Sequence, residues 1–502
     1  MNASRHIIDK VFLDIETISE KEAYWLKDHI SAFLNDQVFP GLEQLFNDMG
    51  ADDSILRFEQ IDLDISLDSW ENPDTLRIEI ENQLREKLAI AAIEKRYPVN
   101  GEKNRSNGIF EYREFSNISG EQNLQSIFLF FLKNGHLPWY GHKSDIDRIL
   151  SEKEWTKRIE TERFLTEVKT LIESDETALE RFVLQLPVPN IIQFINSLNT
   201  FDLSTDFALN TFVESLTTNL RNQFVSILLK IGLQHSESKW KSDLIHFYAA
   251  YLAAHYAEES IEEQIHQLKN ISLHTSLMLS QKECDKVLVL LGDQKQNRPL
   301  KKGLNQKGVK IEDSPTIISH RDSYTVEKEP LFFESEAGEI TVQNAGQVLF
   351  HPFLKLFFQQ FNWLDKNGNI KDVYRIQALQ ALHYCATGNE HFFEGGLVLE
   401  KFLCDVPLQT TLPATSLLNE TIKNEADNML RELIKNWPAL KNTSPAGLRE
   451  MFVNRSGKLI QKDRNYKLIV ERKTQDILLE KLQWNISIIK LPWKKELIFV
   501  EW

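Results

Sequence analysis

The sequence predicts a mainly α-helical protein with a small α/β module at each end. Helical periodicity of apolar residues runs almost without interruption from Asp145 to Leu291. Near the start of the chain apolar and polar residues alternate with the period of two that is typical of a strand, and near its end two alternating segments flank a turn. We therefore expect an N-terminal βαβα unit, a central helical array and a C-terminal α+β module.

The amino-acid composition is that of a globular protein and excludes several other classes. It has 502 residues, of which 42% are hydrophobic and 26% charged, so we expect several folded domains rather than a disordered or fibrous chain. The net charge of −15 argues against a protein that coats nucleic acid. The most apolar stretch, Phe247 to Ala257, is about half as long as a membrane span, and no signal-peptide pattern opens the sequence. We therefore expect neither membrane insertion nor secretion.

The first 96 residues are predicted to form the N-terminal α/β unit. We expect strands over His6 to Thr17 and Phe58 to Leu67, and a helix from Glu20 to Asp48 that Pro40 breaks or kinks. A second helix follows from Pro73 to Arg96. Residues 1–75 hold 17 acidic and 5 basic residues, a net charge of −12. This end of the chain is thus strongly acidic.

Two polar segments separate this unit from the rest of the chain. Residues 97–120 are rich in turn formers and are interpreted as a linker or arm, and residues 121–291 as the helical array. Residues 292–330 lose the apolar periodicity and are predicted to be an exposed linker. Its residues 292–310 carry six Lys or Arg against one Asp, so a basic arm that touches an acidic partner is the alternative.

Residues 331–502 are predicted to form the C-terminal α+β module. A short strand at Ile340 to Val342 precedes a series of helices, and Ser444 is a good N-cap for a helix that begins at Pro445. The end is β-rich, with a predicted hairpin around residues 463–465 and strands over Trp484 to Leu491 and Glu496 to Val500. Residues 455–502 hold 11 basic and 6 acidic residues, a net charge of +5, opposite in sign to the start of the chain.

No residue set stands out as a catalytic or cofactor site. The pattern Asp62-x-Asp64-x-Ser66 resembles the start of a calcium loop, but Leu67 and Pro73 occupy the positions that need Gly and Glu. The chain lacks the phosphate-binding, zinc-protease, CxxC and GxSxG motifs. We therefore expect no catalytic residues, no cofactor and no small-molecule substrate.

The histidines and cysteines do not predict a metal site either. His383 and Cys385 are two residues apart on a predicted helix, where such positions face away from each other, and His391 and Cys404 do not supply the paired spacing of structural zinc. The count of three cysteines, with Cys284 the third, argues against a disulfide framework and fits a reducing compartment. Core packing is the simpler interpretation of Cys385 and Cys404.

Aromatic residues are concentrated at the end of the chain. Four of the ten tryptophans lie in the last 66 residues: Trp437, Trp484, Trp493 and Trp502. Buried aromatic rings fill cores, and partly exposed ones often anchor interfaces. The four rings are therefore either core residues or partner-binding residues, and we take them as the candidate partner-binding site.

Several segments along most of the chain resemble one known family, the tape measure proteins of bacterial extracellular contractile injection systems, which are phage-tail-like particles. The resemblance is carried by residues 6–15 (HIIDKVFLDI), 61–65 (IDLDI), 131–139 (FLKNGHLPW), 344–354 (NAGQVLFHPFL), 381–388 (ALHYCATG), 437–445 (WPALKNTSP) with 447–449 (GLR), 488–493 (IIKLPW) and 499–502 (FVEW).

The resemblance implies a non-catalytic structural role in assembly, in which the protein sets the length of the tube. It implies inner-tube, baseplate or spike proteins as partners, and a location in the bacterial cytoplasm during assembly and inside the particle afterwards. A soluble chaperone or adaptor for spike or effector components, absent from the mature particle, is the alternative. As a fully helical ruler the chain would span about 750 Å at ~1.5 Å per residue, yet both ends are predicted to be globular.

Overall fold

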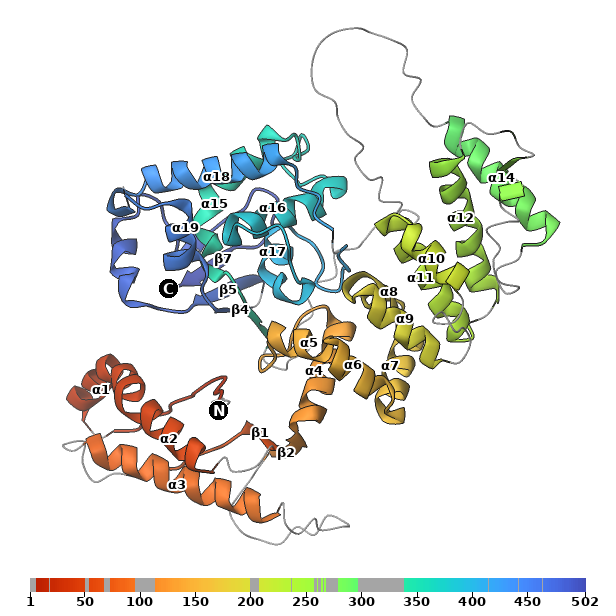
Figure 1. The fold of residues 1–502 in the computed structure, drawn as a ribbon. Helices are drawn as coiled ribbons and strands as arrows, with labels where there is room; N and C mark the ends of the chain where they lie inside the picture. Colours follow the sequence, from red (N-terminus) through yellow and green to blue (C-terminus); the bar gives the residue numbers. More distant parts are fainter. Residues whose placement is uncertain are drawn as a thin grey trace. The chain divides into compact units, whose positions relative to one another are not determined.

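The computed structural model describes residues 6–17, 19–49, 54–66, 73–94, 113–198, 207–235, 237–256, 260, 263–264, 266–267, 279–296, 338–413, 415–440, 442–462 and 464–502. The chain divides into two compact units, Met1–Ile127 and Phe128–Trp502 (Figure 1). Helices predominate in both units, and each contains one small sheet, as the sequence predicts. No helix in the described ranges is long and apolar enough to cross a membrane.

The first unit is built from helices and a two-stranded antiparallel sheet. Its elements are α1 (Glu20–Phe33), a π-helical turn (Leu34–Val38), α2 (Phe39–Met49), β1 (Ser54–Gln60), α3 (Pro73–Glu94), β2 (Arg113–Ser119) and the start of α4 (Gly120–Asn134). Pro40 has no N–H to donate to the preceding turn, and a π-helical turn interrupts the predicted helix over Leu34–Val38, just before α2 begins at Phe39. A small core of residues such as Val38, Leu42 and Leu84 joins α2 to α3.

Two strand predictions in this unit need correction. Residues 6–17 form neither strand nor helix, although the segment alternates as a strand would. Alternation describes side chains, whereas a strand also needs a neighbour for its backbone groups, and among the described residues β1 pairs with β2 instead.

β2 lies inside the segment 97–120 that was interpreted as a linker. Ile61, Leu63 and Ile65 pack against the small core, as their period of two requires, but β1 ends before them, at Gln60.

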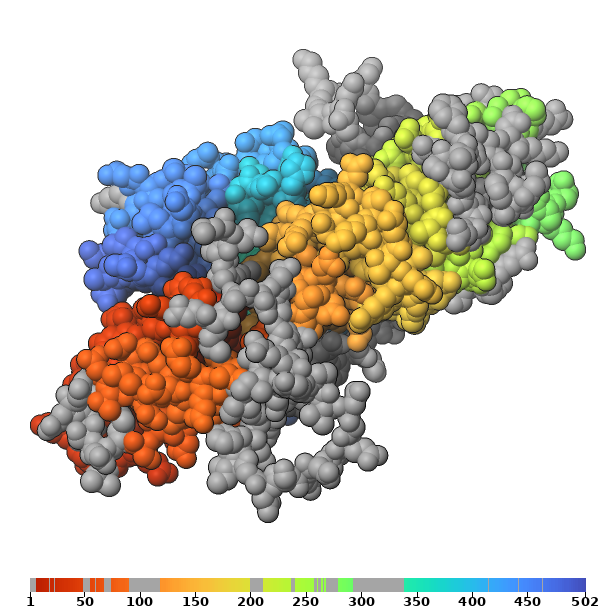
Figure 2. Space-filling view, turned by 60° about the horizontal axis from the view of Figure 1, so that its bottom comes forward, coloured from red at the N-terminus to blue at the C-terminus, as the bar shows by residue number. Residues whose placement is uncertain are grey.

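The second unit begins with an array of short helices. These are α4, α5 (Lys143–Ile149), α6 (Glu152–Ile159), α7 (Glu162–Ser174), α8 (Glu176–Gln185), α9 (Val188–Ser197), α10 (Phe207–Ser215), α11 (Thr218–Gly232), α12 (Glu237–His255) and α14 (Gln281–Gln296). Most consecutive helices from α5 to α14 pack against each other, and Figure 2 shows the surfaces of this part, coloured orange to green, side by side. α14 continues to Gln296, into the segment predicted to be a linker, and residues 297–330 of that segment lie outside the described residues.

The C-terminal part of this unit is an α+β module with a five-stranded mixed sheet. The strand order is β3-β4-β5-β7-β6, with β5 and β7 parallel and the other neighbours antiparallel. The strands are β3 (Glu339–Val342), β4 (Gly457–Lys462), β5 (Asn465–Val470), β6 (Ile488–Ile489) and β7 (Ile498–Glu501). The predicted strand at 340–342 and the hairpin are confirmed, whereas the predicted strand over 484–491 is reduced to β6.

Helices lie between the strands of this module in sequence. They are a 3₁₀ turn (Ala345–Phe350), α15 (His351–Gln360), α16 (Arg375–Thr387), α17 (Val398–Leu403), α18 (Glu420–Lys435), α19 (Pro445–Leu448) and a 3₁₀ helix (Thr474–Lys481). Ser444 caps α19 by accepting a hydrogen bond from the Gly447 N–H at 3.1 Å, as predicted. The inward side chains of the strands, such as Leu459 and Leu468, form one hydrophobic core together with side chains of these helices. The other face of the sheet carries polar and partly exposed residues.

Candidate functional site

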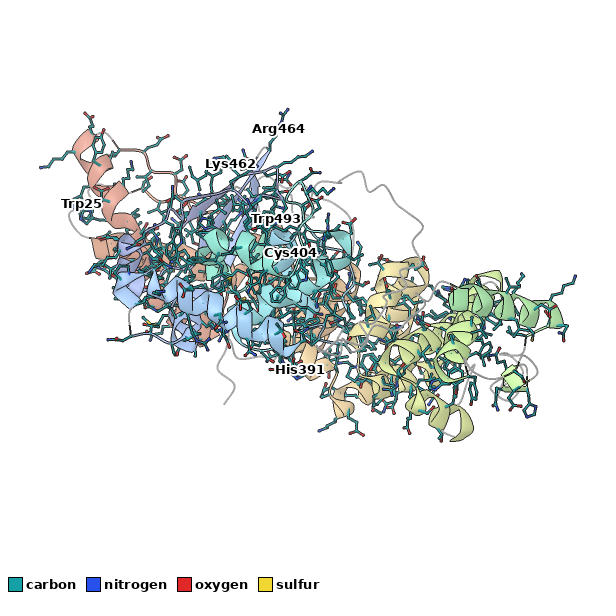
Figure 3. The ribbon with its side chains drawn as sticks, turned by 90° about the horizontal axis from the view of Figure 1, so that it is seen from above. Trp25, His391, Cys404, Lys462, Arg464 and Trp493 are labelled. Carbon is teal, nitrogen blue, oxygen red and sulfur yellow. The ribbon has the colours of Figure 1, made fainter. Side chains whose placement is uncertain are left out.

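Two of the four C-terminal tryptophans are core residues. Trp437 is 0% exposed, and its indole N–H donates to the carbonyl of Leu478 at 3.0 Å. Trp493 is also buried and donates to the carbonyl of Leu403, at the end of α17, at 2.7 Å. Figure 3 shows Trp493 within the module, close to Cys404. Both rings therefore hold the C-terminal residues against the helices of the module.

Trp484 and Trp502 are only half-buried. Both pack against the module's core, and Trp484 contacts Phe353 edge-on with ring centroids 5.5 Å apart. Neither indole N–H has a hydrogen-bond partner in the part of the chain that the structure describes. Both indole nitrogens are themselves buried, and of the four candidate partner-binding residues these two are the less buried ones.

The cysteines and histidines are placed as packing residues. Burial raises the pKa of the Cys385 thiol to about 12 and raises that of Cys404 as well, so neither is a ready nucleophile. His383 lies with Nε2 3.3 Å from the carbonyl oxygen of His391, and His391 itself is on the surface of the module. Within the described ranges no three His, Cys, Asp or Glu side chains converge as metal ligands.

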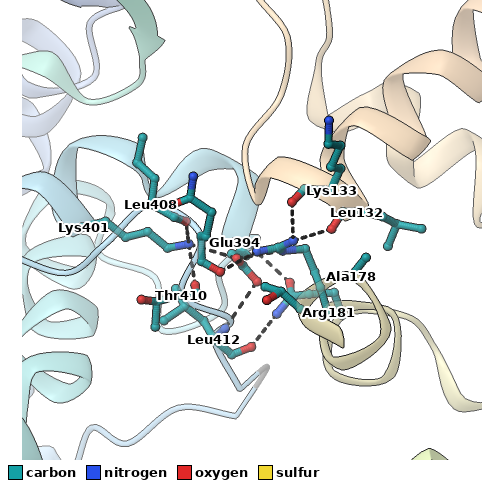
Figure 4. Close-up of polar contacts among 12 residues, drawn as sticks. Leu132, Lys133, Ala178, Arg181, Glu394, Lys401, Leu408, Thr410 and Leu412 are labelled. Atoms are coloured by element: carbon teal, nitrogen blue, oxygen red, sulfur yellow. Dashed lines mark hydrogen bonds and ion pairs between the residues drawn. The ribbon is translucent and has the colours of Figure 1, made fainter. Parts of the chain in front are cut away.

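The most elaborate polar arrangement joins the helical array to the C-terminal module. Arg181 on α8 and Glu394, just before α17, are both fully buried and form an ion pair, with Nε and Oε1 3.0 Å apart (Figure 4). The rest of the guanidinium donates to backbone carbonyls of both parts: those of Leu132 and Lys133 at the end of α4, and that of Gln409. A guanidinium with its donors satisfied in this way can be buried at a tolerable cost.

Lys401 on α17 completes a cluster of three buried charges with Arg181 and Glu394, which we call the junction triad. Its ammonium donates to Glu394 Oε1 at 2.9 Å and to the carbonyls of Leu408 and Thr410, both at 2.7 Å. Burial outweighs the attraction of Glu394 and lowers the pKa of Lys401 to about 8. The lysine is therefore still mostly protonated at neutral pH, and the triad holds two positive charges and one negative charge.

Further contacts surround the junction triad. Gln185, one turn beyond Arg181, donates to the carbonyl of Leu412 at 2.7 Å, and the N–H of Leu412 donates to Glu394 Oε2 at 3.3 Å. The ring of Phe131 on α4 packs against that of Phe393, with centroids 4.7 Å apart. Both polar and apolar contacts thus cross between the array and the module, which explains why residues 128–502 form one compact unit.

Gly135 lets the backbone approach this junction. Its φ of +74° lies in the left-handed region that favours glycine, where it ends α4. A Cβ at this position would lie 2.7 Å from Arg181 Nη2 and 2.8 Å from Glu394 Oε1, closer than real contacts allow. Gly135 is thus needed both for its conformation and for the space that it leaves to the triad.

The sequence analysis did not single out the junction triad. One available signal is that Arg181 lies on the same face of α8 as Ala178 and Phe182, and that Glu400 and Lys401 interrupt the apolar run of α17. A charge on a buried helix face needs a partner of opposite sign, and the sequence offers Glu180 and Glu400 directly beside the two charges. Nothing in the sequence indicates that the partner is Glu394, which lies 213 residues beyond Arg181.

Comparison with known proteins gives one match. The model of a family described as contractile injection system tape measure protein matches residues 5–502, nearly the whole chain. No curated protein and no solved structure matches the chain.

Proposed function

This chain belongs to the contractile injection system tape measure protein family, and we propose that it sets the length of the particle's tube and contacts the baseplate or spike proteins. The structural role follows from the family. The match over residues 5–502 carries the proposal, because it includes the helical array as well as both end modules. We also propose that the protein has no catalytic activity, that it assembles in the bacterial cytoplasm, and that it then lies inside the particle.

The four candidate tryptophans divide between two roles in this proposal. Trp484 and Trp502 are the less buried of the four and are our candidates for contact with a baseplate or spike protein. Trp437 and Trp493 support them from within, since both are buried and hydrogen-bonded. Replacing either buried ring would disturb the whole module, so a test of partner contact should change Trp484 and Trp502 only.

A ruler must extend, and the junction triad opposes extension of residues 128–502. Separating the array from the module would break the ion pair between Arg181 and Glu394 and expose the contact between the rings of Phe131 and Phe393 to water, whereas Lys401 and Glu394 both lie in the module and would stay together. This observation favours a second candidate function: a folded chaperone or adaptor for spike or effector components, absent from the mature particle. The two functions differ in whether the chain's length matters and in whether the protein remains in the particle.

The experiment changes chain length without touching the junction triad. Deleting residues 207–296 removes α10 to α14 but keeps Arg181 and Gln185, and both cut points adjoin segments outside the described residues. A second variant carries an inserted helical segment within residues 301–330. For a ruler, electron microscopy should show tubes shortened and lengthened by about 1.5 Å per residue changed, if the altered segment is helical.

Unchanged tube length in the insertion variant would contradict the ruler. The adaptor is then supported if mass spectrometry does not find the protein in purified wild-type particles. The double substitution of Trp484 and Trp502 by Ala tests the contact proposal separately, because lost co-purification with baseplate or spike proteins is expected only if these rings form the contact. As a matched control, substitution of the exposed Trp139 should leave co-purification intact.

A further inference from the structure

The first unit exposes an unusual amount of apolar surface in one short segment. Within residues 6–17, which we call the donor segment, six large apolar side chains are exposed, and Phe12 is the most exposed of them at 85%. The six are Ile7, Ile8, Val11, Phe12, Leu13 and Ile15. Contiguous apolar surface of this kind on a folded protein indicates that another surface covers it.

The donor segment is attached at one end and has the pattern of a strand. His6 Nε2 lies 2.9 Å from Asn47 Oδ1, and the His6 ring packs against Phe46 at the end of α2. Beyond this attachment Val11, Leu13 and Ile15 alternate with Phe12, Asp14 and Glu16. The segment has no proline, yet it is in no strand of the structure. It has the properties of a strand that lacks a sheet.

The C-terminal sheet offers an edge that such a strand would fit. β6 is an edge strand, and in the described residues it pairs only with β7. Ile488 on β6 is 49% exposed and lies directly opposite Phe499 on β7, which is 40% exposed. The two side chains form an apolar patch on the open face of the sheet, next to that edge. Lys490, which follows β6, is also exposed.

From this complementarity we propose that the donor segment of one copy adds as a strand to the outer side of β6 in a second copy of this chain. As a strand, the donor segment places Phe12, Asp14 and Glu16 on one face, and with that face on the open side of the sheet Phe12 extends the patch of Ile488 and Phe499 and the two carboxylates lie on the same side as Lys490. Asp14 and Glu16 face a basic region, since residues 1–75 have a net charge of −12 and residues 455–502 one of +5. The inference is independent of the ruler function.

The choice of edge follows from charge. Lysine on an edge strand normally keeps sheets from pairing with each other, because it repels a second basic edge. An acidic strand instead neutralises it, so Lys490 selects the donor segment rather than a second β6. The opposite edge, β3, begins with Glu339 and would repel Asp14 and Glu16. The contact is therefore head-to-tail, between different surfaces of the two copies.

Two substitutions at exposed positions test the contact. Leu13→Asp alters the donor segment and Ile488→Asp alters the edge, and both side chains are about half exposed, so folding should be preserved and circular dichroism checks it. Matched controls are Val373→Asp and Ile477→Asp, which change apolar side chains that are more exposed. Analytical ultracentrifugation of the full chain over a range of concentrations should show association in the wild type and both controls, weakened by added salt. Each test variant alone should remain a monomer.

Mixing the two test variants makes the experiment specific for a head-to-tail contact. The Leu13→Asp chain keeps an intact edge and the Ile488→Asp chain keeps an intact donor segment, so the mixture should form 1:1 dimers and nothing larger. A mixture that stays monomeric, or a wild type that is monomeric at all concentrations, overturns the proposal.

Closure within one chain is tested with cysteines at positions 13 and 488. The three native cysteines are buried, so a thiol cross-linker should react at the introduced sites. Cross-linked product at the mass of two or more chains supports the proposal. Product at the monomer mass alone contradicts it.

Discussion

The two compact units differ in where they place residues that are costly in that environment: one buries charged side chains and the other exposes apolar ones. Residues 128–502 bury three charges at the junction triad, and every one of them has partners within the unit. Residues 1–127 instead leave ordinary apolar residues such as Phe12 and Val11 exposed. The charges of the triad are thus paired within the second unit, whereas residues 6–17 of the first unit keep six large apolar side chains at the surface. This difference indicates that the triad holds the array to the module and that residues 6–17 are available for a contact.

The largest loss of stability is expected when the only negative charge of the triad is removed. Glu394→Ala leaves Arg181 and Lys401 buried beside each other without a carboxylate, and we expect the free energy of unfolding of the second unit to fall by roughly 3–5 kcal/mol. Denaturant titration measures this. The control Glu432→Ala removes an exposed partner of Lys435 and should change stability by no more than about 0.5 kcal/mol. Equal effects of the two substitutions would show that the triad does not hold the array to the module.

A smaller effect is expected from the glycine beside the triad. Gly135→Ala must adopt a φ of +74° and also displace Arg181 or Glu394. The left-handed conformation alone costs roughly 1–2 kcal/mol. Gly368→Ala is the matched control, because Gly368 has a φ of +83° but its nearest neighbour would lie 3.9 Å from the new Cβ. Denaturation of both variants should therefore show a larger loss for Gly135→Ala, and a loss no larger than that of the control would mean that the close approach has no cost.

The free energy of unfolding should depend on pH because the charge on Lys401 does. The pKa of this lysine is about 8 in the folded protein and 10.5 as the ordinary value, so between these pH values the unfolded chain binds a proton that the folded chain does not. The free energy of unfolding then rises with pH in that window. We expect the stability of the wild type relative to Lys401→Met to increase from about pH 8 upward and to be constant below it.

A control separates this behaviour from the titration of other lysines. Lys435 is exposed, and Lys435→Met, measured over the same pH range, is the control for replacing a lysine by methionine. Denaturant titrations at several pH values compare the two differences directly. A difference for Lys401→Met that falls as pH rises would contradict the assignment of a lowered pKa.

The sequence predicts much of the fold where the signal is local. The helical array, the interruption of the helix before Pro40, the Ser444 cap and the β4–β5 hairpin each depend on neighbours a few residues apart, and the structure contains them all. The failures depend on distant partners. Residues 6–17 alternate correctly but form no strand, and β2 pairs with β1 across more than fifty residues despite a polar sequence.

The candidate site shows the same limit. The tryptophans are conspicuous in the sequence, but their burial depends on which helices they meet: Trp493 reaches the end of α17, some ninety residues earlier. The junction triad could not be assembled from the sequence, because a buried Arg or Lys indicates only that some carboxylate pairs with it, and Glu180 and Glu400 are much nearer in sequence than Glu394 is to Arg181. The tertiary packing of α8 against the segment before α17 determines that Glu394 is the carboxylate that pairs with both cations.

The smallest loss of stability is expected for an exposed residue of the first unit. If Phe12 is held in the donor segment for a contact with another molecule, Phe12→Ser removes only its exposed contact with the Lys10 ammonium, which lies 5.7 Å from the ring centroid, and the free energy of unfolding should fall by no more than about 1 kcal/mol. Leu45→Ala, in the same unit but within its small core, should cost roughly 2–5 kcal/mol. Denaturant titration under conditions where the chain is monomeric compares them. A large loss of stability for Phe12→Ser would mean that the segment packs within its own unit, and its exposed residues would then no longer be surface kept for a partner.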